Sequence, residues 1–406
     1  MYYKNTLKKL FNLLLIFFVV INFQTCTNEE QDNDPVAPTV HERGDIAQAN
    51  SLGTMTVNDL QQMLANANIT MPFTLNYSVE AISLDYYTTD GSGKQTILSG
   101  AIMIPQGVSN LPLTSIQHGT QTKDNLVASV SPLNSTEGII GLIMASMGYL
   151  VVVPDYPGFG VSNVIHPYLH AESLVPSIID LMRAGRNYSS QHQIILDGKV
   201  FLTGYSEGGY ATLVTQRKIE MDYSQEFNLT AVAPMAGPYD LYGMMQTLFQ
   251  TGQYNHTAYV AYILTAYNNV YGWNRLNDFF NPPYPSMMQN LFDGSKTFGE
   301  IVNQLPSTFL ELMDSNFVNN VRNGNEAAFS AVLLENTLLD WIPQAPINFI
   351  HGDADEISPY QNTLSAFDRL TANGGTNIQI TTIPGGNHED SGQRAVVEAI
   401  EWFESM

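Results

Sequence analysis

The sequence predicts an α/β fold, with a mostly parallel central sheet that helices cover on both faces. Short apolar segments with strand character alternate along most of the chain with longer segments of helical periodicity. This alternation is typical of parallel sheets, because their strands are joined by helices that pack on both faces. The alternation fails over one long stretch, and one strand runs directly into a glycine-rich turn. These two exceptions carry most of the functional information in the sequence.

The composition narrows the class of protein. The chain has 406 residues, of which 44% are hydrophobic and 13% charged, and its net charge is −22. An apolar content of this size excludes a wholly disordered chain. Nucleic-acid binding needs a basic surface, so we do not expect nucleic acid as a partner. The single cysteine, Cys26, excludes an intrachain disulfide and a zinc site built from cysteines.

Residues 1–25 show the pattern of a secretory signal peptide, in which lysines precede an apolar run from residue 10 to residue 23. The run is shorter than the ~20 residues of a comfortable membrane span. Cys26 follows directly and opens a polar, acidic segment, residues 26–46, that is typical of a tether. The arrangement resembles a bacterial lipoprotein signal. That resemblance implies secretion across the inner membrane and anchoring through a lipidated Cys26 on the outer membrane or cell surface. An ordinary cleaved signal with an incidental cysteine is the alternative.

The folded domain is expected to begin at about Ala47. Strand alternation at residues 78–87 and 97–104, on either side of a turn, predicts a hairpin. The uncharged run 138–153 predicts a helix that ends at a glycine and leads into a core strand, rather than a membrane segment. Further strands are expected at 113–117, 151–153, 199–203, 229–233, 347–350 and 378–383, and helices at 171–188, 211–220 and 396–403.

Residues 238–340 form the stretch in which the alternation fails. They are rich in tyrosine, phenylalanine and methionine, and they contain helix-like segments but no convincing strand pattern. A structureless loop of this length would be unusual in a compact domain. We therefore expect an inserted, mainly helical subdomain between two parts of one α/β core, residues 47–237 and 341–406.

Ser206 has the sequence context of a catalytic nucleophile. The strand at 199–203 runs into Gly204-x-Ser206-x-Gly208 and then into a helix. A serine on such a sharp strand-to-helix turn is held out of the sheet, and the glycines leave room where side chains would collide. The helix N-terminus and the backbone N–H after the serine face a developing oxyanion. The alternative is a glycine-rich turn that contains a serine by chance.

A nucleophilic serine needs a base and an orienting acid, which in this arrangement follow it in the order Ser, Asp or Glu, His. The order selects His388 as the base, because it is the histidine that follows a late strand, in a glycine-flanked loop. Three acids compete on the loop after the strand at 347–350, namely Asp355, Asp353 and Glu356.

With these parts the sequence resembles an α/β-hydrolase over nearly all of residues 47–406. Residues 147–160 and 236–241, together with the long insertion, resemble the secretory lipase family that includes fungal lipase A. On the acid loop the family-like spacing Gly-x-x-Asp-x-x-x-Pro favours Asp355, with Asp353 as the runner-up. Glu356 is the least favoured of the three.

The resemblance also implies a second oxyanion donor after the strand at 113–117. We assign it to the backbone N–H of Thr120, partnered by the backbone N–H of Glu207. His118 precedes the nucleophile in the chain and is expected to be structural.

The resemblance implies a helical cap over the site and the hydrolysis of carboxylic esters. We expect a serine esterase or lipase in which Ser206 attacks, His388 is the base and Asp355 orients it, with no metal or organic cofactor. The aromatic insertion is expected to cover the site and to form an apolar acyl pocket. The expected partner is a small-molecule or lipid ester, and a monomer is expected. A serine peptidase on the same fold and a non-catalytic surface lipoprotein that binds glycans or lipids are the alternatives.

Overall fold

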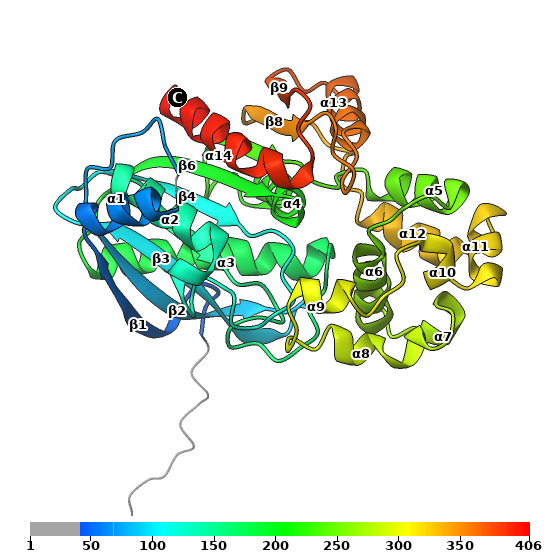
Figure 1. The fold of residues 1–406 in the computed structure, drawn as a ribbon. Helices are drawn as coiled ribbons and strands as arrows, with labels where there is room; N and C mark the ends of the chain where they lie inside the picture. Colours follow the sequence, from blue (N-terminus) through cyan, green and yellow to red (C-terminus); the bar gives the residue numbers. More distant parts are fainter. Residues whose placement is uncertain (1–40, 68) are drawn as a thin grey trace, which may run out of the picture. The chain divides into compact units, whose positions relative to one another are not determined.

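A nine-stranded sheet runs through the part of the chain that the computed structural model describes, residues 41–67 and 69–406 (Figure 1). Its strand order is β1-β2-β3-β5-β4-β6-β7-β8-β9. The strands are β1 (Ile46–Met55), β2 (Val79–Thr89), β3 (Gln95–Pro105), β4 (Leu111–Gln117), β5 (Leu150–Pro154), β6 (Leu196–Tyr205), β7 (Leu229–Met235), β8 (Ile347–Gly352) and β9 (Ile378–Ile383). From β1 to β5 neighbouring strands are antiparallel, and from β5 to β9 they are parallel. The predicted mostly parallel sheet and the hairpin of β2 and β3 are confirmed.

Helices cover both faces of this sheet. The face that carries α1 (Val57–Asn66), α2 (Thr136–Met147) and α14 (His388–Glu404) has its own apolar cluster, and α3 (Ala171–Gln191) and α4 (Glu207–Asp222) pack on the other face. Strand β5 shows the alternation, since Val151 and Val153 belong to the first cluster and Leu150 and Val152 to the second. Burial on both sides explains why the parallel strands read as continuous apolar runs. The remaining core elements are η1 (Pro132–Asn134) and α13 (Gln361–Ala372).

The uncharged run 138–153 divides into a helix and a strand, as predicted. Ser135 accepts a hydrogen bond from the backbone N–H of Gly138 and so caps the start of α2. Gly148 ends the helix in the left-handed conformation, with φ at 114°. Strand β5 begins two residues later, with all five residues buried. Within residues 41–67 and 69–406, every helix is too short or too polar to span a bilayer.

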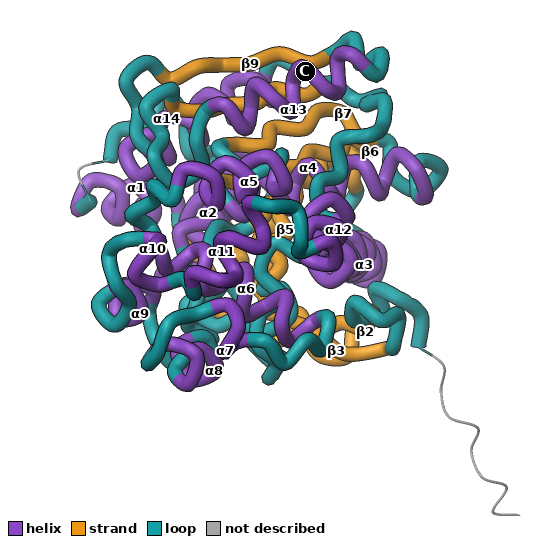
Figure 2. Tube along the Cα trace, turned by 90° about the vertical axis from the view of Figure 1, so that its right-hand side faces the viewer, coloured by secondary structure: helices purple, strands orange, loops and turns teal. Residues whose placement is uncertain are grey.

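Helices also occupy the stretch between β7 and β8. They are α5 (Leu241–Thr251), α6 (Thr257–Val270), α7 (Leu276–Phe279), η2 (Tyr284–Ser286), α8 (Met288–Leu291), α9 (Phe298–Val302), α10 (Phe309–Leu312), α11 (Ser315–Arg322) and α12 (Ala327–Glu335). Figures 1 and 2 show them grouped at the end of the molecule toward which the parallel strands point. Many of the aromatic side chains pack on one another, as Phe249 does with Phe309, Phe317 and Phe329. These rings form the interior of the helical segment itself.

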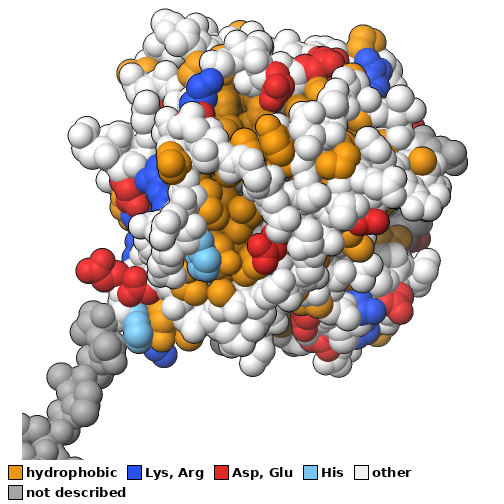
Figure 3. Space-filling model, turned by 90° about the vertical axis from the view of Figure 1, so that its left-hand side faces the viewer, with side chains coloured by type: hydrophobic (Ala, Val, Ile, Leu, Met, Phe, Trp, Pro, Cys, Tyr) orange, Lys and Arg blue, Asp and Glu red, His pale blue; other side chains and the backbone are white. Residues whose placement is uncertain are grey.

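The face of the molecule opposite these helices has a different character. There, hydrophobic side chains gather in a shallow, elongated hollow with few charges inside it (Figure 3).

The start of the described chain is fixed to the core rather than extended. The predicted signal peptide, Cys26 and the tether as far as residue 40 lie outside the described residues. The tether was expected to reach residue 46, but residues 41–46 contact the core: the backbone N–H of Gly44 donates to Tyr87 O at 2.7 Å, and β1 begins at Ile46.

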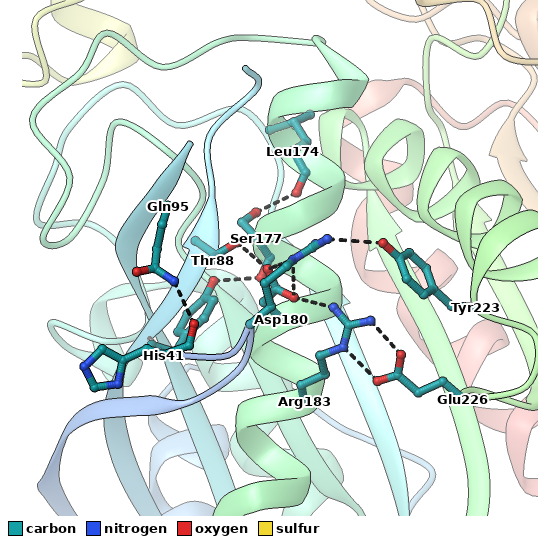
Figure 4. Close-up of polar contacts among 11 residues, drawn as sticks. His41, Thr88, Gln95, Leu174, Ser177, Asp180, Arg183, Tyr223 and Glu226 are labelled. Atoms are coloured by element: carbon teal, nitrogen blue, oxygen red, sulfur yellow. Dashed lines mark hydrogen bonds and ion pairs between the residues drawn. The ribbon is translucent and has the colours of Figure 1, made fainter. Parts of the chain in front are cut away.

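Asp180 of α3 holds this segment through a buried charge (Figure 4). Its carboxylate accepts hydrogen bonds from Arg43 at 2.9 Å and from Arg183 at 2.6 Å. It also accepts one from the hydroxyl of Thr88 at 2.5 Å. The Asp180 side chain is fully buried, whereas Arg183 continues outward to Glu226 at the surface. Two cations and a hydroxyl therefore compensate the one buried carboxylate.

Replacing Asp180 with Ala should lower the free energy of unfolding by about 3 kcal/mol, because the buried partners lose their acceptor. Glu226→Gln is the matched control, since this exposed partner of Arg183 should contribute less than about 1 kcal/mol. Urea unfolding of both variants measures the difference. Equal, small losses would contradict the anchoring role of Asp180.

Candidate active site

Ser206 lies in a strained turn between β6 and α4. Its φ and ψ are 59° and −120°, a combination that L-residues rarely adopt. Backbone atoms of neighbouring segments pack closely around this turn, where the glycines leave room for them. A Cβ atom on Gly208 would lie 2.1 Å from Gln117 O, and one on Gly204 would lie 2.5 Å from Gly208 O. The two glycines of the sequence motif are therefore required by the contact between β4, β6 and α4.

His388 lies within hydrogen-bond distance of both Ser206 and Asp355. Its Nε2 is 2.9 Å from Ser206 Oγ, and its Nδ1 is 2.6 Å from Asp355 Oδ2. The carboxylate fixes the proton on Nδ1, which leaves Nε2 free to accept a proton from the serine hydroxyl. His388 was expected in a tight loop but is the first residue of α14, because Asn387 caps the helix by accepting from Asp390 N at 2.7 Å.

Asp355 is the acid that the structure brings to His388. Its Oδ1 accepts backbone hydrogen bonds from Ile357 at 2.9 Å and Ser358 at 2.8 Å, and its Oδ2 accepts from His388 and from His351. Burial alone would raise the pKa of this carboxyl, but hydrogen bonds from His351 and His388 and the charge of both rings lower the pKa to about 2. The site therefore favours an ionised Asp355.

The two competing acids point elsewhere. Asp353 is exposed and accepts a hydrogen bond from Gly385 N at 2.6 Å, so it fastens the loop after β9. Glu356 is also exposed and lines a separate, shallow surface depression beside Tyr254.

His351 contacts Asp355, and the sequence analysis did not predict this contact. Its Nε2 lies 3.0 Å from Asp355 Oδ2 and 2.9 Å from Ser358 O, so this nitrogen must carry a proton. The ring is fully buried, and its Nδ1 lies 2.7 Å from Thr363 Oγ1. His351 ends the strand at 347–350, so the sequence analysis, which sought a histidine after a late strand, did not select it. The spacing His351-x-x-x-Asp355 is the signal that links the two residues.

The two predicted oxyanion donors belong to residues near Ser206. Thr120 follows β4 and lines the same cavity as Ser206 and His388, and a Cβ on the preceding Gly119 would be 3.9 Å from Ser206 Cβ. The N–H of Gly119 is engaged by Glu137 Oε1 at 3.0 Å. Glu207 is the first residue of α4, where a backbone N–H has no partner within the helix.

The side chain of Glu207 makes a second contact that the sequence did not indicate. It is fully buried, and its Oε1 lies 2.7 Å from Nε2 of the buried His166. The other ring nitrogen of His166 lies 2.7 Å from Pro157 O and therefore donates to it. One proton must lie between His166 and Glu207, so the pair as a whole is neutral. His118, by contrast, meets backbone oxygens of Asp155 and Gly119 with its two ring nitrogens, which fits the expected structural role.

A cavity of about 710 Å³ opens at Ser206. At this end it is lined by polar groups, among them Thr120, Glu137 and His388. Farther in, its lining comes from α2, α14 and the sheet. The expectation that the aromatic insertion forms the apolar pocket is wrong for this cavity, since Tyr259 is the residue that the insertion contributes to its lining. Among the described residues, no group of three or more His, Cys, Asp and Glu side chains could hold a metal ion.

The lowered pKa of Asp355 makes stability depend on pH. Because the folded-state pKa is about 2 against an ordinary 3.8, the group contributes stability above the ordinary value and loses it as the pH falls through 2. The difference corresponds to about 2 kcal/mol. Asp355→Asn should therefore reduce the loss of unfolding free energy between pH about 5 and about 2. Urea titrations at the two pH values test this, and Asp353→Asn should behave as the unaltered protein.

Comparison with known proteins agrees with this architecture. The family model of the secretory lipases matches residues 135–405. Lipase 9 of Candida albicans is 22% identical over 268 residues, which cover 63% of this chain and 55% of that protein. The chain thus spans about half the length of this curated relative.

Solved structures are similar as well. The rice cell wall degrading esterase LipA from Xanthomonas oryzae is 26% identical with a TM-score of 0.80, over 88% of this chain and 98% of that chain. Candida antarctica lipase A in its closed state has a TM-score of 0.69 over 90% of this chain and 82% of that one, at 18% identity, and so shares the fold. The central sheet with its covering helices is that of the α/β-hydrolases, and the chain belongs to the secretory lipase family.

Proposed function

We propose that the protein hydrolyses carboxylic esters through a covalent acyl-enzyme formed on Ser206. The observation that carries the proposal is the continuous hydrogen-bonded chain from Ser206 Oγ through His388 to Asp355, on a strained turn beside a cavity. Membership of the secretory lipase family and similarity to the esterase LipA support an ester as the substrate. Each residue of the chain then has a defined chemical task.

In the first step, Ser206 Oγ attacks the ester carbonyl carbon and His388 Nε2 takes the hydroxyl proton. The negative charge that develops on the carbonyl oxygen is stabilised by the backbone N–H groups of Thr120 and Glu207, each worth about 10²–10³ in rate. His388 then donates the proton to the leaving alcohol. Asp355, which is ionised over the ordinary pH range, stabilises the imidazolium that exists between these steps.

In the second step, water attacks the acyl-enzyme with His388 again as the base, which releases the acid and restores Ser206. This cycle needs one nucleophile, one base and two oxyanion donors, and our candidates are Ser206, His388 and the backbone N–H groups of Thr120 and Glu207. Amide hydrolysis uses the same machinery, so a peptidase activity would appear in parallel assays of an ester and an amide that share one acyl group.

Ser206→Ala should lower kcat for the hydrolysis of p-nitrophenyl butyrate by roughly 10⁵–10⁶. The purified variant should keep the circular dichroism spectrum of the unaltered protein. A fluorophosphonate probe should label the unaltered chain and Ser92→Ala, which changes an exposed serine of the β2–β3 turn, but not Ser206→Ala. A kcat of Ser206→Ala within ten-fold of the unaltered protein, or absence of labelling at Ser206, would exclude the mechanism.

Asp355→Asn should lower kcat by roughly 10³–10⁴, because the amide no longer selects the reactive tautomer of His388. Asp353→Asn is the matched control, and its kcat should fall by less than about three-fold, since that carboxylate is exposed and only fastens a loop. Steady-state kinetics on one ester decide between the two acids. The opposite ranking would transfer the orienting role to Asp353.

We propose further that the chain is anchored to a membrane through a lipidated Cys26, on the strength of the sequence alone. Cys26→Ser should then move the protein from the membrane fraction to the soluble fraction and abolish incorporation of radiolabelled palmitate. Ester hydrolysis per molecule should not change. Palmitate incorporation that survives the substitution would contradict this anchor.

A further inference from the structure

The cavity beside Ser206 lies between one stripe of α14 and one stripe of α2. On α14 the lining residues His388, Gly392, Val396 and Ile400 recur every four positions, so they share one side of the helix. On α2 the corresponding residues are Thr136, Ile139, Ile140, Ile143 and Met144. The two helices lie on the same face of the sheet and contribute to one apolar cluster. The cavity therefore follows the helix axes.

The sheet and one loop close the remaining sides. Ile116 of β4 and Met235 of β7 line the cavity from the sheet, and both are buried. Thr203 of β6 also lines it, but its hydroxyl is already bonded to Ala233 O at 2.9 Å. Ile69 and Met71, which follow α1, complete the enclosure.

Polarity changes along the length of the cavity. The acidic and histidine side chains of the lining, His118, Glu137, His388 and Glu389, belong to the ends of α2, α14 and β4 that lie near Ser206. Beyond them the lining is aliphatic, with Ile143, Met144 and Ile400 nearly inaccessible to solvent. From His388 to Ile400 there are twelve residues (400 − 388), or about 18 Å of helix. A sugar or peptide would find few polar partners along this path.

We propose that this cavity binds the acyl chain of the ester, and that the chain is an unbranched hydrocarbon of medium to long length. The inference rests on the proposed ester hydrolysis at Ser206. The acyl group stays bonded to Ser206 until water releases it, whereas the alcohol must leave first. A largely aliphatic cavity suits the part that stays, and its volume is that of ligand sites for molecules of this size.

The placement differs from a pocket inside the helical insertion. The aromatic side chains of that segment pack against one another, and Tyr259 of α6 meets the cavity at its polar end. The specificity for acyl length should therefore depend on α2 and α14.

The test compares p-nitrophenyl acetate with p-nitrophenyl laurate. Val396 is 8% exposed, and Val396→Phe narrows the cavity there. The variant should lower the laurate-to-acetate ratio of kcat/KM at least ten-fold, because each methylene kept out of the cavity lowers kcat/KM for laurate ~4-fold. Val396→Ala should leave the ratio equal or higher. Leu334→Phe adds a ring on the exposed side of α12 and should leave activity and ratio unchanged.

The outcomes separate this inference from the proposed function. Unaltered protein without activity on either ester would refute ester hydrolysis itself. Activity with a ratio that Val396→Phe does not alter would refute the acyl site alone. A change confined to a series of acetate esters with lengthening alcohols would assign the cavity to the alcohol part instead. Calorimetry can test the site without catalysis. Ser206→Ala should still bind laurate, and the double variant Ser206→Ala/Val396→Phe should not.

Discussion

The close approach of α4 to β4 is the constraint on which the active site depends. Gly208 lies so near Gln117 that no side chain fits between them, and Ser206 in the same turn has a positive φ. The serine then stands at the carboxyl edge of the sheet. Because β4, β6, β7, β8 and β9 are parallel neighbours, the loops that follow them meet at this edge. Thr120, Asp355 and His388, which are far apart in the chain, come together for that reason.

Two buried carboxylates flank the nucleophile, and the protein treats them differently. Asp355 receives two backbone N–H groups and two histidines, a set of donors that keeps it ionised. Glu207 receives His166, and among the described residues its second oxygen has no partner. The proton shared with His166 makes that pair neutral. In the proposed mechanism a fixed negative charge would face the imidazolium on His388, while the pair beside the N–H of Glu207 would carry no net charge.

The sequence predicts the parts of this site that depend on local pattern. Ser206 was predicted because a strand, two glycines and a helix are contiguous, and His388 because the chain order of the residues restricts the choice. His166 and His351 were not found, because their partners are fixed only when distant segments pack. Strand β1 was also missed: it is an edge strand with mostly exposed residues, so it carries no apolar alternation. Asp353 is exposed and Asp355 is buried. The sequence of the loop on which both lie does not show this difference.

The absence of charge after Glu137 in α2 has two separate causes. Gly141 and Leu142 face the sheet, where a Cβ on Gly141 would lie 2.4 Å from Met103 Sδ. Ile140 and Ile143 belong to the side that lines the cavity. A helix that packs on a sheet needs one apolar stripe, and its other side is normally polar. The second apolar stripe of α2 lines the cavity, and this explains why it is not polar. The aromatic side chains of the insertion pack mainly against one another. The aliphatic side chains of α2 form part of the hydrocarbon surface beside Ser206.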